Sequence, residues 1–236
     1  MNQIDIGISV NFPYILNNNF INLFKYGILN AHGGDLPRYR GTACQAWAII
    51  NGEKRIGLCV HKMEPDELDN GDIISKEYLN INSNTKILEI YKWIEQKTPI
   101  LFLDSIRKLQ ENSSYILQKQ SKNPKDILMC YPRKPDDGKI NWLMKSIDIH
   151  RLVNASRKPY QGAFCYCENK KYFINDTNII KYKHRILALP GQILKISDDF
   201  LDVATGDGVI RIKEINYKNK IVNIKKIFKS IRLRLS

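Results

Sequence analysis

The hydrophobic pattern changes along the chain, and this change constrains the fold more than any other feature of the sequence. In the first half, short apolar runs that favour strands alternate with segments of helical period, in which apolar residues recur every three to four positions. Beyond Ala163 the apolar residues recur at every second position, and Gly206-Asp207-Gly208 marks a turn between two such segments. The sequence therefore predicts an α/β body followed by a small β-rich unit.

Several segments of the first half are expected to build the α/β body. Ser83 and Asn84 precede a periodic segment, as helix caps do, and Pro99 is expected to open a second helical stretch that continues to Leu109. Asn17 to Asn19 are expected to cap a short helix. The expected strands are Ile4–Val10, Gly27–Leu29, Arg55–Met63 and Asp72–Leu79, and a further helix is expected over Thr42–Ile50.

A polar linker around Ser121 to Lys125 follows this body and leads to a helix predicted from about Leu143 to Ser156. The strands expected after it are Ala163–Tyr166, Lys171–Ile174, Gln192–Ile196, Phe200–Ala204, Val209–Ile215 and Ile221–Ile227. We therefore predict two domains. A catalytic core with a helical extension spans residues 1–184, and a small β-rich subdomain spans residues 185–236.

The composition and the segment types indicate the cellular location and the kinds of binding partner. The formal charge of +13 would favour polyanions, but the lysines are scattered among Asn and Ile, which argues against a nucleic-acid partner. No segment resembles a secretory signal or a membrane span, so we expect a cytoplasmic protein without a membrane partner. Neither a disulfide framework nor a zinc site is expected from the spacing of the five cysteines, Cys44, Cys59, Cys130, Cys165 and Cys167.

The segment NAHGGDLPRYRG, from Asn30 to Gly41, follows a buried apolar strand. Asn30 and His32 are two residues apart, so their side chains lie on the same side of an extended segment and can meet one ligand. Gly33 and Gly34 would let a substrate approach the backbone closely. In open α/β sheets this end of a strand is where ligand crevices form. Taken alone, however, the Asn-x-His pair favours a polar loop with a hydrogen-bonded histidine over a ligand site.

A second group of polar residues follows in the segment LDNGDII. It places Asp69 in a glycine-containing turn ahead of a strand, a common arrangement that alone predicts only a turn. The combination is more specific. N-x-H, L-P-x-Y-R-G, G-x-x-x-H from Gly57 to His61 and D-x-G-x-I occur in this order within residues 30–73.

In this combination the sequence resembles the formyltransferase family that uses N10-formyltetrahydrofolate. Further matches are Trp47-Ala48-Ile49, Asn51-Gly52-Glu53, Asp136-Asp137-Gly138 with Ile140 and Trp142, and PYQGAF from Pro159 to Phe164. The resemblance implies a Rossmann-like core and transfer of a formyl group to an amine. The H-G-G form of the loop and the short C-terminal part are most similar to enzymes that formylate amino sugars linked to a nucleotide.

The resemblance implies catalytic roles for Asn30, His32 and Asp69. Asn30 and a protonated His32 would donate to the oxyanion that forms when an amine attacks the formyl carbon. His32 would also move protons near neutral pH, while Asp69 would orient it and raise its pKa. The chain has no H-E-x-x-H, nucleophile elbow or P-loop, so no metal or covalent intermediate is expected. His61, His150 and His184 are interpreted as structural or surface residues.

The resemblance also implies binding residues. The folate donor would lie against apolar residues of the first domain, namely Phe12, Tyr14, Ile15, Leu16 and Leu68. Arg40 would hold the loop or a substrate phosphate, and Arg133 and Lys134 would contact a diphosphate or form a solvated basic turn. The full set of expected substrate-binding residues is Gly33, Gly34, Arg40, Tyr131, Arg133 and Lys134.

The sequence departs from the family pattern in two places. The βα units that precede Ile4–Val10 in the family are apparently missing, which would expose a sheet edge and favour pairing with another chain. Asn154 stands where relatives often carry arginine, which weakens any anion contact there. Strand pairing through the β-rich C-terminus is the expected route to a homodimer.

The leading hypothesis is a sugar N-formyltransferase that acts on a nucleotide-linked amino sugar. The acceptor would be a dTDP-4-amino-4,6-dideoxyhexose, and the product would enter surface polysaccharide synthesis, such as that of lipopolysaccharide O-antigen. One alternative is a methionyl-tRNA formyltransferase, which the basic charge favours. The other is a shortened, non-catalytic protein that binds a sugar nucleotide but no folate.

Overall fold

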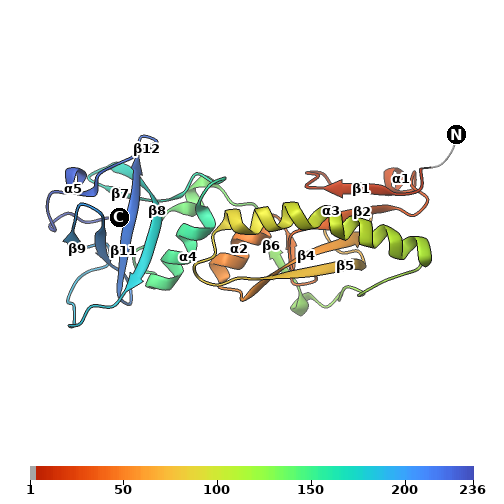
Figure 1. Ribbon diagram of the computed structural model, residues 1–236, viewed down its shortest axis with the longest axis horizontal. Coiled ribbons are helices and arrows are strands. Elements are labelled where there is room, and N and C mark those ends of the chain that lie inside the picture. Colours follow the sequence, from red (N-terminus) through yellow and green to blue (C-terminus); the bar gives the residue numbers. More distant parts are fainter. Residues whose placement is uncertain (1–3) are drawn as a thin grey trace. The chain divides into compact units, whose positions relative to one another are not determined.

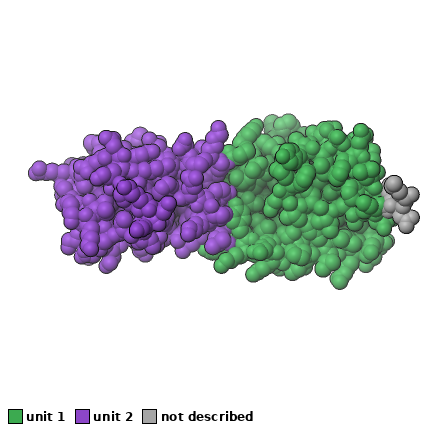
Figure 2. All heavy atoms as spheres, turned by 90° about the horizontal axis from the view of Figure 1, so that it is seen from above, with its two compact units in different colours: residues 1–48, 54–81, 89–132 green, residues 49–53, 82–88, 133–236 purple. Residues whose placement is uncertain are grey.

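The computed structural model describes residues 4–236 and divides the chain into two compact units. The first unit comprises the chain up to residue 48 with residues 54–81 and 89–132, and the second comprises residues 49–53, 82–88 and 133–236 (Figure 2). The long C-terminal part of the second unit therefore begins at residue 133, not at the expected residue 185. Strand β8 (Lys170–Ile180) pairs with β11 (Val209–Tyr217), so a boundary at 185 would cut through one sheet.

A four-stranded sheet forms the centre of the first unit (Figure 1). Its strands are β1 (Gly7–Val10), β2 (Ile28–His32), β4 (Arg55–Lys62) and β5 (Ile73–Asn80), in the order β1-β2-β4-β5. Strands β1 and β2 are parallel, whereas β4 runs antiparallel to both β2 and β5. The mixed α/β body that the sequence predicts is thus confirmed.

One face of this sheet is apolar and packs against α3 (Ile87–Glu111). Leu29 and Ala31 of β2 lie on this face, in one cluster with Leu101 and Phe102 of the helix. Because side chains alternate along a strand, Asn30 and His32 lie on the opposite face. The sheet therefore separates the apolar core from the polar side chains of the sequence motif.

Helix α3 is continuous through Pro99, so the expected start of a second helix at that residue is wrong. Proline inside a helix leaves the carbonyl of residue i−4 without its N–H partner. Here that carbonyl belongs to Glu95, and both Glu95 and Pro99 are exposed, so water can satisfy it. The apolar packing of the helix against the sheet tolerates this local loss.

Strand β1 forms one edge of the sheet. Gly7 and Ser9 are buried, whereas Ile8 and Val10 are 55% and 49% exposed. Within residues 4–236, β2 is the only named strand that pairs with β1. The exposed sheet edge that the sequence predicts is therefore present among the described residues.

The remaining elements of the first unit surround the sheet. Strands β3 (Tyr39–Gly41) and β6 (Leu128–Cys130) form a separate parallel pair. Helix α1 (Asn18–Ile21) begins after Asn17, whose side chain accepts from the Phe20 N–H. Helix α2 spans Cys44–Asn51, and a 3-10 helix spans Pro124–Asp126.

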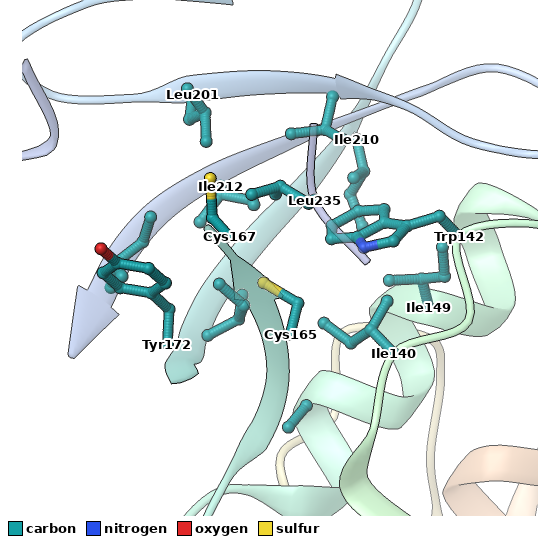
Figure 3. Close-up of a cluster of buried hydrophobic side chains, with 14 of the residues drawn as sticks. Ile140, Trp142, Ile149, Cys165, Cys167, Tyr172, Leu201, Ile210, Ile212 and Leu235 are labelled. Carbon is teal, nitrogen blue, oxygen red and sulfur yellow. The ribbon is translucent and has the colours of Figure 1, made fainter. Parts of the chain in front are cut away.

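The second unit is built on an antiparallel sheet with the path β7-β8-β11-β10-β9. Helix α4 (Ser146–Ser156) contributes Ile149, Leu152 and Val153 to its core, and Cys165 and Cys167 are buried there as small apolar side chains (Figure 3). Its other elements are a 3-10 helix at Pro135–Gly138, β7 (Ala163–Cys167), β9 (Ile193–Ile196), β10 (Leu201–Ala204), β12 (Lys220–Ile221) and α5 (Ile224–Ile227). No helix among residues 4–236 is long and apolar enough to cross a membrane.

Candidate active site

Strands β2 and β4 bring two polar side chains together on the face of the first sheet opposite its apolar face. Asn30 is paired in register with His61, and its Nδ2 lies 3.2 Å from His61 Nε2. His61 Nδ1 lies 2.8 Å from the Lys62 carbonyl oxygen, which can only accept. His61 therefore carries a proton on Nδ1, and its Nε2 faces both the Asn30 amide and the Asp69 carboxylate.

Asp69 reaches the same face from the loop between β4 and β5. Its carboxylate lies between two imidazoles, with Oδ2 3.3 Å from His32 Nδ1 and Oδ1 3.5 Å from His61 Nε2. The backbone N–H of Gly41 donates to Oδ2 over 2.9 Å. The structure thus brings together the three predicted catalytic residues, and His61 joins them.

Both ring nitrogens of His32 face protein oxygens. Nε2 lies 2.6 Å from the carbonyl oxygen of Tyr39, so this nitrogen donates, and Nδ1 faces the Asp69 carboxylate. The Cys44 thiol lies 3.7 Å from Nε2. A proton taken up by neutral His32 would therefore enter at Nδ1, where Asp69 stabilises the resulting charge.

Burial controls the protonation of this cluster. His32 is 8% exposed, and burial lowers its pKa below the usual 6.5, although Asp69 acts in the opposite direction. Asp69 thus raises the His32 pKa as expected, but burial has the larger effect. Burial alone would raise the pKa of Asp69, but His61, His32 and the Gly41 N–H outweigh it and lower that pKa to about 2. At neutral pH the site holds an uncharged His32 beside an ionised Asp69.

His61 lies in the polar cluster, a position that the sequence did not indicate. It is 2% exposed and bonded within the cluster, whereas the sequence suggested only a structural or surface role. The signal was present in the G-x-x-x-H spacing, but its meaning depends on the antiparallel register that places His61 opposite Asn30. His150 is indeed structural, since its Nδ1 and Nε2 contact Thr177 and Asn84 in the second unit.

Gly34 is required by the protein's own packing, and Gly33 lies close to neighbouring side chains. A Cβ at Gly33 would collide with the side chain of Gln45, and one at Gly34 would collide with the carbonyl oxygen of Tyr39 and the His32 ring. Neighbouring residues of the protein thus approach both glycines closely, and close approach of a substrate there stays a prediction.

Arg40 is 5% exposed and holds the loop, one of the two roles considered for it. Its Nη2 donates to the Gln120 side chain over 2.9 Å and to the Ser121 carbonyl oxygen over 3.1 Å. Its Nε also donates to the Gln120 side chain, over 3.2 Å. These bonds direct the guanidinium into the protein, so the alternative of a substrate phosphate contact is disfavoured.

The expected donor-binding residues form exposed apolar surface in two loops of the first unit. Phe12, Tyr14 and Ile15 are 52%, 72% and 58% exposed, and Leu68 is 43% exposed. The loops are joined where the Asp66 N–H donates to the Leu16 carbonyl oxygen over 3.2 Å. Leu68 directly precedes Asp69, so this apolar surface adjoins the polar cluster along the chain.

The expected acceptor-binding residues fall into both units. Tyr131 is an exposed residue of the first unit, whereas Arg133 and Lys134 line a pocket of about 240 Å³ in the second unit. Arg133 donates to the Ser156 hydroxyl over 2.9 Å and lies over the Tyr160 ring, 5.6 Å from its centroid. The pocket therefore combines a fixed guanidinium with an aromatic wall.

The residues described contain no group of three or more His, Cys, Asp or Glu side chains that could hold a metal ion. The fold and site instead define an α/β protein in which a buried Asn-His-Asp cluster lies at the end of a strand. Residues 1–106 match the family model described as formyl transferase, and residues 133–232 match the one described as formyl transferase, C-terminal domain. The chain belongs to the formyltransferase family.

Individual relatives agree with this assignment. The methionyl-tRNA formyltransferase of Clostridium tetani is 33% identical over 218 residues, which cover 92% of this chain and 67% of that protein. Among solved structures, HypX from Aquifex aeolicus in complex with tetrahydrofolic acid has a TM-score of 0.68 at 17% identity, covering 96% of this chain and 39% of HypX. WlaRD, a sugar 3N-formyl transferase, has a TM-score of 0.67 at 22% identity, and the match covers 91% of this chain and 73% of WlaRD.

Proposed function

We propose that this protein transfers a formyl group from N10-formyltetrahydrofolate to the amine of a nucleotide-linked amino sugar. The observation that carries the proposal is the cluster in which Asp69 lies within 3.5 Å of both His32 and His61, with Asn30 bonded to His61. Such a cluster provides a neutral base, an anion that stabilises its protonated form and an amide donor. These are the groups that acyl transfer to an amine requires.

The described residues fit a folate. Phe12, Tyr14, Ile15 and Leu68 offer apolar and aromatic surface for a flat ring system. Ser9 is paired in register with Asn30, and the described residues supply no hydrogen-bond partner for its buried hydroxyl. A ligand with polar ring substituents would satisfy this hydroxyl.

N10-formyltetrahydrofolate supplies the formyl group. The Asn30 amide uses one N–H toward His61, and we assign its second N–H to the formyl oxygen, where negative charge develops as the amine attacks. Such a donor is worth about 3 to 4 kcal/mol in the transition state. The amine proton reaches His32 Nδ1 through the Asp69 carboxylate that this nitrogen faces, and Asp69 stabilises the imidazolium until the proton returns by the same route to the leaving nitrogen.

The pocket lined by Arg133 and Tyr160 supports a nucleotide-linked acceptor. A guanidinium suits phosphate oxygens, and an aromatic wall suits a sugar or base. WlaRD, with which this chain shares its fold, was crystallised with dTDP. We propose a dTDP-4-amino-4,6-dideoxyhexose as the acceptor, with a cytoplasmic homodimer supplying the product to surface polysaccharide synthesis.

A methionyl-tRNA formyltransferase is the second candidate. The curated relatives at 28–33% identity carry this name, and the chain has a charge of +13. Neutralised phosphates release counterions, so binding of initiator tRNA that weakens steeply with salt would favour this candidate. Binding of dTDP without any binding of folate would instead favour a non-catalytic sugar-nucleotide-binding protein.

The deciding experiment is mass spectrometry of the acceptor after incubation with the purified protein and N10-formyltetrahydrofolate. Separate reactions would contain dTDP-4-amino-4,6-dideoxyglucose, its 3-amino isomer and methionyl-tRNA. We expect one added formyl group on the 4-amino sugar, and none with His32→Ala or Asp69→Ala. Formylation of methionyl-tRNA alone would replace the proposal by the second candidate, and no product with any acceptor would refute formyl transfer to these acceptors.

A further inference from the structure

Gln120 is a buried residue that connects a separate segment of the chain to the turn bearing Asp69. It is 8% exposed, and its backbone N–H donates to Asp72 Oδ1 over 3.3 Å. Two residues earlier, the Gln118 carbonyl oxygen accepts from the Ile73 N–H over 2.9 Å. The segment is thus fixed against the start of β5, 51 residues after Asp69 in sequence.

The Gln120 side chain uses its full hydrogen-bonding capacity. Nε2 donates to the carbonyl oxygens of Asp69 and Gly71 over 2.9 and 2.7 Å. Oε1 accepts from Nε and Nη2 of Arg40 over 3.2 and 2.9 Å. Because an amide nitrogen has two N–H groups and an amide oxygen has two lone pairs, this arrangement also fixes the orientation of the amide.

The Asp69 turn needs such support. Asp69 has φ +51°, in the left-handed region that residues with a Cβ rarely adopt. A Cβ at Gly71 would collide with the carbonyl oxygen of Lys62, so the turn lies tightly against β4. Hydrogen bonds to the carbonyl oxygens on both sides of Asn70 hold this conformation.

Strand β3 fixes Asp69 at two points through consecutive residues. Arg40 orients Gln120, which holds the Asp69 backbone, and the Gly41 N–H binds the Asp69 carboxylate directly. The carboxylate in turn contacts His32 and His61. We propose that Gln120 is a positioning residue that holds the Asp69 carboxylate against these two imidazoles.

The proposal rests on the proposed function for its kinetic consequences but not for its structural ones. Glutamate at position 120 would face two carbonyl oxygens without a donor, although it would still attract Arg40. Methionine would keep the length of the side chain but lack both the donors and a strong acceptor. Gln120→Glu and Gln120→Met therefore remove the same pair of donors, the first with an added negative charge and the second without any charge.

The test is a histidine NMR titration of the full chain in the absence of any substrate. The chain has four histidines, and the buried His150 of the second unit reports whether that unit remains folded, with circular dichroism as the control for the whole chain. We expect Gln120→Met to move the His32 titration to lower pH, because the Asp69 charge that favours protonation is displaced, and Gln120→Glu to move it less, because its own carboxylate also favours protonation. The exposed Gln118 contributes only backbone bonds here, so Gln118→Glu and Gln118→Met are matched controls expected to leave it unchanged.

Kinetics supply the second readout. In the Gln120 variants we expect kcat for formyl transfer to fall about 10- to 100-fold with KM for the acceptor little changed, since a misplaced catalytic group affects the chemical step. Gln120→Asn, which keeps donors and acceptor on a shorter side chain, should lie between the parent and Gln120→Met. An unchanged His32 titration in folded Gln120 variants would overturn the proposal. A shifted titration in a protein without transferase activity would support it while refuting the proposed function.

Discussion

The polar cluster and the exposed apolar surface of the first unit are built in opposite ways. In the cluster, His32, His61 and Asp69 are each at most 8% exposed, and protein groups contact their polar atoms. On the apolar surface, Phe12 and Tyr14 are more than half exposed and lie in a loop outside the named strands and helices.

This difference separates two kinds of constraint. The cluster is fixed by strand register and by contacts between residues far apart in sequence, so its geometry exists before any ligand binds. The apolar surface has solvent on one side, and a ligand would be needed to bury it. We therefore expect substitutions in the cluster to change kcat and substitutions on the apolar surface to change KM for the donor.

The largest effect is expected for Asp69→Asn. The change keeps the shape of the side chain but removes the charge that stabilises protonated His32. We expect kcat to fall by about 10³-fold, within the range typical of lost acid–base catalysis. Steady-state kinetics at neutral pH measure it, with circular dichroism as the control for folding. Retention of more than a tenth of the parent kcat would contradict the role assigned to the carboxylate.

A smaller loss is expected for His61→Gln. Glutamine can still accept from Asn30, but it lacks the Nδ1–H that fixes the side chain to the Lys62 carbonyl oxygen. We expect a fall in kcat of about 10-fold, because the catalytic groups remain but are held less firmly. His184→Gln, in a loop of the second unit, is the matched control and should have no effect. Equal kcat values for the two variants would contradict this prediction and indicate that His61 has a purely structural role.

These predictions also show what the sequence could reveal. Asn30 and His32 share a face because strands alternate, a local rule that the apolar run before them made visible. His61 was missed because its role depends on the register between β2 and β4, which no local pattern gives. Gln120 was missed for a related reason, since it lies in an irregular segment and acts on a turn 51 residues away.

For the fold, too, the sequence predicted the local elements but not how they pair. Strand and helix periods identified the α/β body and the β-rich unit, whereas the position of the boundary required knowing that β8 pairs with β11. Pro99 misled the prediction because packing of α3 against the sheet outweighs one lost backbone bond. Local chemistry thus gave the elements, and long-range pairing decided how they combine.

The apolar surface can be tested with Tyr14→Ser. Tyr14 is 72% exposed and its ring contacts Phe12 edge to face, with centroids 5.7 Å apart. We expect KM for the donor to rise about 10-fold while kcat is unchanged. One aromatic contact contributes about 1–1.5 kcal/mol, and about 1.4 kcal/mol corresponds to a tenfold change in affinity. Tyr26→Ser, at another exposed tyrosine of the first unit, is the control. A fall in kcat with KM unchanged would instead place Tyr14 with the cluster.

The smallest effect is a pH dependence that follows from burial of His32. Its folded pKa lies below 6.5, near which it would titrate in the unfolded chain. The unfolded state therefore binds more protons as pH falls below 6.5, and stability declines there. Asp69, with a folded pKa of about 2 against 3.8, contributes stability that is present above 3.8 and is lost only in stronger acid.

Thermal unfolding across this range separates the two groups. As pH falls from neutral to below 6.5, the unfolding midpoint of the parent should drop more than that of His32→Gln, because only the parent contains His32, whose pKa is lowered by burial. His150 also has a lowered pKa through burial, so both proteins should retain a common part of the decline. If the two midpoints fall in parallel, His32 is not held neutral by its surroundings. The contrast between the buried polar cluster and the exposed apolar surface would then not include a buried neutral imidazole.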